Sequence, residues 1–259
     1  MEILITGVDG YIGKALYDYL SNKYNVLGIN RGKCNLRDCR EVERVFANKK
    51  FDAVIHTAAQ GGSRLEKDAV EDLYDNLQMF LNLLKHRGKY GRFIHFGSGA
   101  QFVHNDFYAL SKKIISSIMQ ELDVFYNIII YGLFDHNELP TRFIKSSVRK
   151  ALKQDDIIIH KNKKMDFFHM EDLKVLVDYY LTFPTPRQTL ECCYKTSLTL
   201  LEIASIIKDL CNSKSKIRIL NVGLGAPYTG INSATLNSII EKDFLERLKE
   251  SVLNIRLNG

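Results

Sequence analysis

Two hydrophobic periods alternate along the first half of the chain and predict strands and helices in turn. Short apolar runs rich in β-branched residues are typical of strands that are buried on both faces. Between these runs, apolar residues recur every three or four positions, as they do on a helix with one buried face. The expected strands are 3–5, 24–30, 52–57, 92–96 and 124–131, and the expected helices are 11–20, 39–48, 73–86 and 107–122. This alternation predicts a doubly wound α/β fold with a parallel sheet.

The pattern changes after residue 131, where helical and extended segments become shorter and less regular. Pro184 and Pro186 mark a break, and Thr199 with Glu202 forms a capping box that predicts the start of a helix. We therefore expect a large domain and a small C-terminal lobe. The expected large domain is 1–135 with 155–180, and the expected lobe is 136–154 with 181–259.

A glycine-rich turn follows the first expected strand. Gly7, Gly10 and Gly13 are spaced three residues apart. The first expected helix begins at Tyr11, and Ile12 follows in its first turn. Because glycine lacks Cβ, backbone N–H groups can approach a ligand closely there. A strand, a glycine turn and a helix N-terminus form a pyrophosphate site, so we expect these five residues to bind a dinucleotide. The spacing is GxxGxxG rather than GxGxxG, and the alternative is a plain β–α turn.

Tyr108 and Lys112 form a YxxxK pair at the start of an expected helix. Residues four apart share a helix face, so the ammonium would lie beside the phenol and lower its pKa. Such a tyrosine can donate or accept a proton near neutral pH. Ser98 ends the preceding strand and could hydrogen-bond the same substrate oxygen. Tyr19 and Lys23 have the same spacing, but they lie at the far end of the first helix.

Several blocks together resemble a known family over about residues 1–180. The glycine turn, the run 56–59 (HTAA), Asn76, Ser98, the YxxxK pair and the run 167–173 (FFHMEDL) are similar to an extended short-chain dehydrogenase/reductase of the nucleotide-sugar epimerase/dehydratase/reductase branch. The resemblance implies a Rossmann-like fold with a small C-terminal substrate lobe. Residues 31–63 most resemble GDP-fucose synthase-type 4-keto-sugar reductases.

The resemblance also assigns expected roles to residues of this chain. Asn35 and Leu36 would flank the adenine of the cofactor, and further contacts would come from Ala58, Ala59, Gln60, Asn76, Tyr108 and Lys112. Ser98, Gln101 and Arg142 would face a nucleotide-sugar substrate. In this reading Ser98, Tyr108 and Lys112 are the catalytic residues.

Departures from the family pattern narrow the expected reaction. Ala100 stands where related epimerase/reductases carry a cysteine, and Arg142 most nearly matches their histidine. Gly99 and Ala100 also replace the Asp–Glu pair of related dehydratases. Hydride transfer with Tyr108 as general acid remains, which predicts a reductase of a nucleotide-linked 4-keto-6-deoxy sugar. A C4 epimerase and an inactive dinucleotide-binding protein stay open, because only ten residues separate Ser98 from Tyr108 and relatives have a longer segment there.

The cofactor is expected to be NADP(H), with NAD as the other possibility. The second strand ends in Asn30-Arg31-Gly32 and carries no acidic residue there. An acid at this position binds the ribose 2′-hydroxyl of NAD, whereas an arginine favours the 2′-phosphate of NADP. Arg31 is therefore expected to bind the cofactor, and the alternative is a solvated loop arginine.

Composition and charge exclude several classes of function. The chain has 259 residues and a net charge of +6, but its basic residues are scattered, so we expect no nucleic-acid partner. Five cysteines without a CxxC pair favour reduced thiols and a cytoplasmic protein, and no run is long enough to predict a membrane span or partner. No cluster has metal-ligand spacing, and we expect His56, His95 and His169 to be structural. Surplus apolar residues on the helices 73–86 and 107–122 suggest a homodimer interface.

Overall fold

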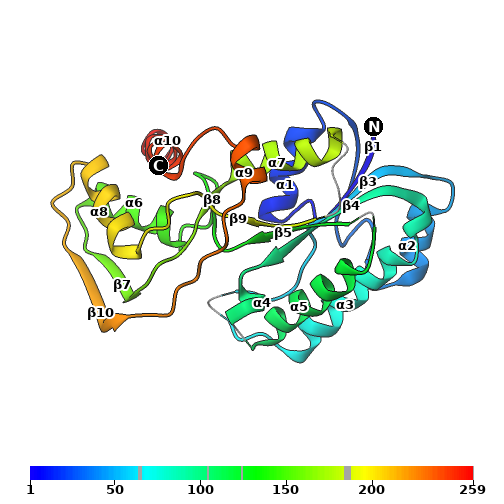
Figure 1. The fold of residues 1–259 in the computed structure, drawn as a ribbon, viewed down its shortest axis with the longest axis horizontal. Coiled ribbons are helices and arrows are strands. Elements are labelled where there is room, and N and C mark those ends of the chain that lie inside the picture. Colours follow the sequence, from blue (N-terminus) through cyan, green and yellow to red (C-terminus); the bar gives the residue numbers. More distant parts are fainter. Residues whose placement is uncertain (64–65, 104, 124, 184–187, 259) are drawn as a thin grey trace. The chain divides into compact units, whose positions relative to one another are not determined.

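A six-stranded sheet with the order β2-β1-β3-β4-β5-β9 organises the first half of the chain (Figure 1). Its strands are β1 (Glu2–Thr6), β2 (Asn25–Ile29), β3 (Phe51–His56), β4 (Tyr90–Ser98), β5 (Phe125–Ile130) and β9 (Gln188–Cys192). β1 pairs in parallel with both β2 and β3, and β3 pairs in parallel with β4. The strand order therefore reverses at β1, and the predicted doubly wound class is confirmed.

Helices cover both faces of this sheet. α2 (Cys39–Phe46), α3 (Val70–Leu84) and α5 (Phe107–Gln120) lie on one face, while α1 (Tyr11–Leu20) and α7 (Met170–Thr182) lie on the other (Figure 1). The core under α2, α3 and α5 contains Leu4, Val42, Phe80, Phe93 and Ile115, each at most 1% exposed. Each large apolar side chain buried there contributes roughly 1.5–3 kcal/mol. The apolar positions that predicted the helices are thus the ones that pack on the sheet.

The computed structural model describes residues 1–63, 66–103, 105–123, 125–183 and 188–258. These form two compact units: unit 1 is Met1–Ile129 with Lys174–Leu190, and unit 2 is Ile130–Leu173 with Glu191–Gly259. No helix among these residues is long and apolar enough to cross a membrane.

Unit 2 is built from two small sheets and four helices. β6 (Leu133–Phe134) pairs with β8 (Phe168–His169), and β7 (Ile157–Asn162) pairs in parallel with β10 (Ile217–Leu224). The helices are α6 (Phe143–Lys153), α8 (Leu200–Leu210), α9 (Ala234–Ile239) and α10 (Phe244–Asn258). The expected boundaries differ here. Residues 155–173 belong to unit 2, because β7 pairs with β10 and β8 pairs with β6 within that unit. Residues 181–190 belong to unit 1, because β9 joins the large sheet.

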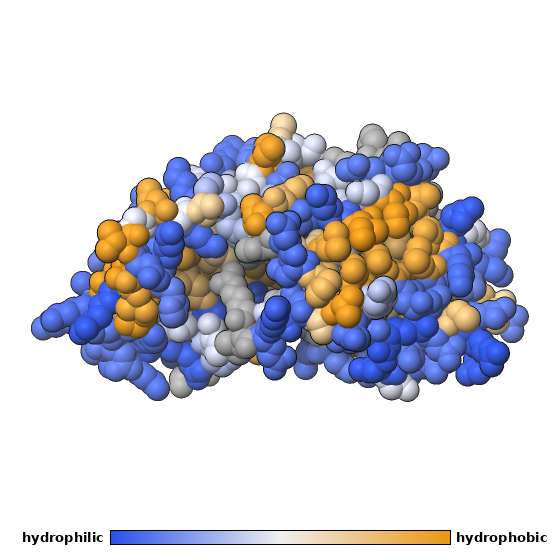
Figure 2. All heavy atoms as spheres, turned by 90° about the horizontal axis from the view of Figure 1, so that it is seen from below, coloured by the Kyte–Doolittle hydropathy of each residue, from blue (hydrophilic) through white to orange (hydrophobic). Residues whose placement is uncertain are grey.

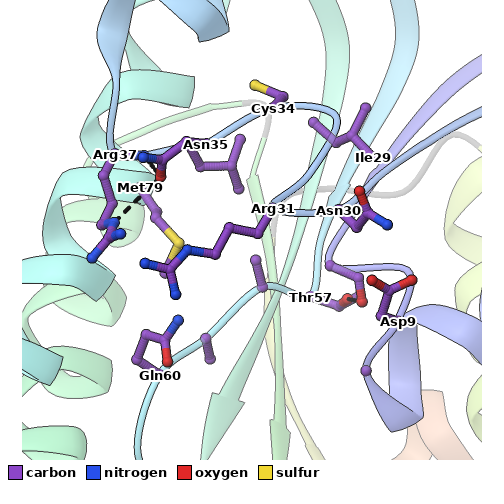
Figure 3. Close-up of a pocket in the computed structure, with 15 residues that line it drawn as sticks. Asp9, Ile29, Asn30, Arg31, Cys34, Asn35, Arg37, Thr57, Gln60 and Met79 are labelled. Carbon is purple, nitrogen blue, oxygen red and sulfur yellow. Dashed lines mark hydrogen bonds between the residues drawn. The ribbon is translucent and has the colours of Figure 1, made fainter.

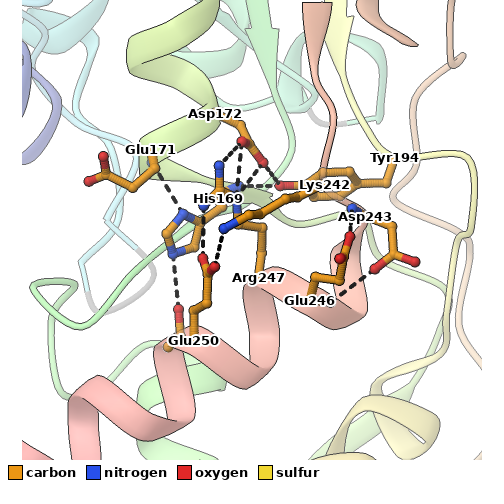
Figure 4. A network of polar contacts seen from close by, with 10 residues as sticks. His169, Glu171, Asp172, Tyr194, Lys242, Asp243, Glu246, Arg247 and Glu250 are labelled. Carbon is orange, nitrogen blue, oxygen red and sulfur yellow. Dashed lines mark hydrogen bonds and ion pairs between the residues drawn. The ribbon is translucent and has the colours of Figure 1, made fainter.

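A buried ionic network fixes α10 within unit 2 (Figure 4). The Asp172 carboxylate, 2% exposed, accepts hydrogen bonds from the Arg247 guanidinium, with Nε 3.0 Å from both oxygens, and from the Tyr194 hydroxyl. Arg247 Nη1 also lies 2.8 Å from a Glu250 oxygen. Since α10 carries Arg247 and Glu250, this network ties the C-terminal helix to the first turn of α7.

His169 lies beside this network and contacts both α10 and the start of α7. Its Nε2 is 3.1 Å from Ser251 Oγ on α10, and its Nδ1 accepts a hydrogen bond from the Glu171 amide at 3.2 Å (Figure 4). Burial lowers the pKa of His169 to about 4, so the ring is neutral at physiological pH. The neutral His169 ring therefore helps to hold α10 through its hydrogen bond with Ser251.

Candidate active site

The glycine turn after β1 is closely packed against the end of β3. Gly7 has φ +72°, and a Cβ there would lie 2.8 Å from Ala58 Cα. A Cβ on Gly13 would lie 2.2 Å from the Gly7 carbonyl oxygen and 2.5 Å from Thr57 Oγ1. Only glycine fits at Gly13, so α1 can begin directly against the turn. The first N–H groups of a helix have no partner within it, and a close backbone of this kind fits a pyrophosphate.

A cavity of about 230 Å³ opens at the carboxyl ends of β1, β2 and β3 (Figure 3). It lies where the strand order reverses, which is the usual ligand position in such sheets. Expected cofactor residues that line it are Gly7, Gly10, Arg31, Asn35, Leu36, Ala58, Ala59 and Gln60. Residues that we did not assign are Asp9, Ile29, Asn30, Cys34, Arg37, Thr57 and Met79. For Asp9, Asn30 and Thr57 the available signal was their position just after a strand, whereas Met79 lies on α3 and had no such signal.

Two arginines face this cavity in different states. Arg37 is held by Asp75, whose oxygen lies 2.7 Å from Nη1, and by the Asn35 side chain at 3.3 Å. Arg31 forms no ion pair with any residue in the described part of the chain, and its side chain extends across the cavity toward Met79 (Figure 3). Arg31 is thus the cavity arginine whose charge remains available to an anionic ligand.

Asn76 supports the cavity from behind rather than lining it. Its Oδ1 accepts a hydrogen bond from the Gln60 amide at 2.8 Å, and its Nδ2 donates to the Gln60 carbonyl and to Ser111 Oγ, both at 3.0 Å. This side chain, 3% exposed, therefore fixes the loop after β3 against α5. Tyr11, Ile12 and Gly13 likewise lie outside the cavity lining.

Tyr108 and Lys112 come together at the start of α5. Asp106 caps this helix by accepting a hydrogen bond from the Ala109 amide at 2.7 Å. Lys112 Nζ lies 5.6 Å from the centre of the Tyr108 ring and donates to the Phe96 carbonyl at 2.8 Å. Burial lowers the pKa of Lys112 to about 8, so its proton can be exchanged near neutral pH. The half-buried Tyr108 ring packs on Gly62, where a Cβ would come within 3.0 Å.

The second YxxxK pair has a different environment. Lys23 Nζ lies 2.7 Å from the Tyr19 hydroxyl and 2.6 Å from an Asp178 oxygen. The hydrogen bond that Lys23 donates to Asp178 raises the pKa of Lys23, which keeps it charged. Tyr24 also donates to Asp178, at 2.7 Å. This cluster ties α1 to α7 and is a structural contact.

The short segment after Ser98 forms α4 (Ala100–Val103) rather than an extended loop. Ser98 Oγ accepts a hydrogen bond from the Ala100 amide at 3.2 Å. Gln101, expected to face substrate, instead lies in the interior at 6% exposure, with Nε2 3.4 Å from Ser116 Oγ. Asn127 donates to the same hydroxyl at 2.9 Å. The Ser116 hydroxyl thus links the Gln101 and Asn127 amides in the interior, while Gln101 Oε1 has no hydrogen-bond partner among the described residues.

Arg142 and the three histidines that we expected to be structural are divided between the two units; His169 lies beside the network in unit 2. Arg142 is exposed and directly precedes α6 in unit 2. His56 is buried, with Nδ1 2.8 Å from Thr6 Oγ1. His95 is also buried, but neither ring nitrogen has a hydrogen-bond partner among the described residues, and burial lowers its pKa well below its ordinary value. Among the residues that the structure describes, no group of His, Cys, Asp or Glu side chains could hold a metal ion.

The fold and the cavity together define the class of protein. A parallel sheet that reverses at β1, with a glycine turn and a cavity at the strand ends, is a dinucleotide-binding fold of the Rossmann type. The model of the NAD dependent epimerase/dehydratase family matches residues 3–191, so the chain belongs to that family. The expected class, an NAD(P)-dependent enzyme of the extended short-chain dehydrogenase/reductase type, is confirmed.

Solved structures of similar proteins cover nearly the whole chain. A GDP-6-OMe-4-keto-L-xylo-heptose reductase from Campylobacter jejuni is 14% identical with a TM-score of 0.78, covering 100% of this chain and 98% of its own. A UDP-glucose 4-epimerase from Thermotoga maritima is 16% identical with a TM-score of 0.81, covering 100% and 99%. A GDP-L-fucose synthetase from Naegleria fowleri bound to NADP is 19% identical with a TM-score of 0.76, covering 99% and 93%. At these identities the likeness shows the fold. No curated protein matches the chain in sequence.

Proposed function

We propose that the protein is an NADP(H)-dependent reductase of a nucleotide-linked 4-keto-6-deoxy sugar. The observation that carries this proposal is the placement of Lys112 beside the Tyr108 ring and against the end of β4. Two structural neighbours support the substrate class, because their names describe reductases of GDP-linked heptoses. The missing cysteine, histidine and Asp–Glu pair argue against proton exchange next to the keto group and against dehydration, and favour reduction.

The proposed mechanism gives Tyr108, Lys112 and Ser98 a defined role each. The cofactor, when bound, supplies the hydride that reduces the keto carbon. Tyr108 donates its phenolic proton to the alkoxide that forms, and the Lys112 ammonium beside its ring holds the cofactor ribose. Ser98 Oγ accepts a hydrogen bond from the Ala100 amide, so its own O–H can donate a hydrogen bond to the substrate carbonyl and orient it.

The residues of the cavity fit a dinucleotide. The turn at Gly7 and Gly13 has no room for a Cβ, which suits a close pyrophosphate. Leu36 and Met79 offer apolar surface for an adenine, and Arg31 offers a charge for its ribose phosphate. Structures of two neighbours hold NADP, which supports the same cofactor here.

Arg31→Ala is expected to change the cofactor preference without changing the chemistry. Loss of this charge removes an ion pair with the 2′-phosphate of NADP, so the Kd for NADPH should rise by about tenfold or more, whereas that for NADH should change little. Binding is measured by the fluorescence of the reduced nicotinamide. Arg40→Ala, an exposed arginine on α2 outside the cavity, is the matched control. An equal effect of Arg31→Ala on both cofactors would contradict the assignment of Arg31.

The proposed reaction is tested with a panel of nucleotide-linked keto sugars and either NADPH or NADH. A reductase consumes reduced nicotinamide in proportion to the sugar, which its absorbance reports directly. A C4 epimerase, which would use the same Tyr108, Lys112 and Ser98, converts the sugar without net consumption. Cofactor binding without turnover of any sugar would indicate an inactive dinucleotide-binding protein and would overturn the proposal.

We also propose that two copies associate through α3, α4 and α5. Figure 2 shows an apolar patch with a hydrophilic rim, the usual composition of a protein–protein interface. Exposed apolar side chains on these helices are Tyr74, Leu81, Phe102, Val103, Phe107 and Leu110. If both copies used these same helix faces, they would form a closed dimer with two-fold symmetry.

Leu110→Glu is expected to convert the proposed dimer to a monomer. The side chain is 41% exposed, so the chain should still fold, but a charge in the patch would stay buried and unpaired after association. Light scattering should give about twice the chain mass of 29.8 kDa for the unmodified protein and one chain mass for the variant. Leu257→Glu on α10, 72% exposed, is the control and should remain dimeric. A monomeric unmodified protein at micromolar concentration would contradict this interface.

A further inference from the structure

The outer strand of the small β7–β10 sheet exposes an unusual amount of aliphatic surface. Along β10 the exposed fraction rises from 39% at Ile219 to 55% at Leu220 and 98% at Val222, and it is 72% at Leu224. β10 has no strand partner other than β7 among the described residues. A smaller apolar group is visible at the left of Figure 2. We call Leu220, Val222 and Leu224 the β10 tip.

Positive charge lies next to this aliphatic surface, on the neighbouring strand β7 and the residues that follow it. Neither β7 nor β10 contains an aspartate or glutamate. Exposed lysines lie within or beside the two strands, at Lys161, Lys164, Lys214 and Lys216. Arg218 on β10 forms an ion pair with Asp156, with Nε 2.5 Å from a carboxylate oxygen. Because the pairing is parallel and places Asn221 opposite Lys161, Lys161 and Lys164 lie near the β10 tip, whereas Lys214 and Lys216 precede the other end of β10.

The geometry of the strand excludes two kinds of occupant. The β7–β10 register shifts between Asn221 and Leu224, and Gly223 has φ +87° with no atom within 4 Å of a Cβ placed there. A partner strand needs a regular row of backbone groups, which the chain lacks where its side chains are most exposed. A second copy of β10 would bring like charges together. Aliphatic side chains on an open bulge, with Lys161 and Lys164 beside them, suit a surface that is apolar inside and anionic outside.

We propose that the β10 tip binds peripherally to an anionic lipid bilayer. Leu220, Val222 and Leu224 would enter the boundary between headgroups and acyl chains, and the neighbouring lysines would contact lipid phosphates. This departs from our expectation of no membrane partner, which rested on the absence of a long apolar run. The proposal is independent of the catalytic assignment, because every residue that it uses lies in unit 2.

Vesicle co-sedimentation tests this proposal with the full chain. Vesicles of phosphatidylcholine alone are compared with vesicles that also contain phosphatidylserine. The unmodified protein should sediment with the anionic vesicles, and raised salt should weaken binding. The double variant Val222→Ser with Leu224→Ser should bind about tenfold less, because it removes apolar contacts and leaves the charges intact.

Matched variants separate the apolar and electrostatic contributions. Leu253→Ser with Leu257→Ser on α10, 55% and 72% exposed, should bind vesicles like the unmodified protein. Lys161→Ala with Lys164→Ala should weaken binding to anionic vesicles about tenfold, since each cation near an anionic surface adds attraction. Failure of the unmodified protein to bind anionic vesicles, or undiminished binding by the Val222/Leu224 variant, would overturn the proposal. Thermal unfolding confirms that every variant is folded.

Discussion

Tyr108→Phe should lower kcat by about 10²–10⁴-fold, the usual contribution of a positioned proton donor. The substitution removes only the hydroxyl, so the ring can still pack on Gly62 and beside Lys112. Because the lost proton transfer occurs in the chemical step, the KM for the sugar and the Kd for NADPH should change little. Steady-state kinetics and cofactor fluorescence measure the two effects separately.

The chain provides its own control for this substitution. Tyr19 belongs to the other YxxxK pair, where Lys23 is held by Asp178. Tyr19→Phe also removes a phenol beside a lysine, but this phenol lies away from the cavity and should leave kcat unchanged. Full turnover by Tyr108→Phe would contradict the assignment of the general acid, as would an equal loss in Tyr19→Phe.

Arg247→Leu is expected to lower the free energy of unfolding by about 3–5 kcal/mol, because it leaves a buried carboxylate without its cation. Asp172 is 2% exposed, and its strongest partner is the Arg247 guanidinium. Tyr194 continues to donate to Asp172, but a hydroxyl cannot compensate a full charge. Urea denaturation followed by circular dichroism measures the change.

The same network contains an exposed pair for comparison. Lys242 lies against Glu250, with side chains 44% and 37% exposed. Solvent screens such a pair, so Lys242→Ala should change the free energy of unfolding by only about 0–1 kcal/mol. If both variants lose the same small amount, the Asp172–Arg247 pair does not anchor α10.

The fold of the first half of the chain could be predicted because the sequence patterns of its strands, helices and turns are local. Each strand of the large sheet before β9 is a short apolar run, and the turn after β1 needs glycine for steric reasons that hold whatever follows. The Tyr108–Lys112 contact is local too, since it spans one helical turn. Predictions of this kind depend on few neighbours, and the structure confirms the fold class.

Contacts between distant segments could not be predicted in the same way. β9 joins the large sheet, while β7 joins β10, and neither partner is readable from the strand's own residues. The resemblance placed Gln101 at the substrate, but its side chain contacts Ser116, which lies on another helix. Arg37 carries no sequence signal that Asp75 would hold it. These outcomes depend on side chains that meet only after the chain has folded.

The central claim is that this chain passes a hydride from NADP(H) to the keto carbon of a nucleotide sugar, with Tyr108 as the acid. Its most direct test uses NADPH that carries deuterium at the transferable position of the nicotinamide, with mass spectrometry of the sugar product. The account predicts one deuterium on the former keto carbon for each NADPH consumed. A product without deuterium, or bound NADPH that no nucleotide-linked keto sugar oxidises, would contradict it.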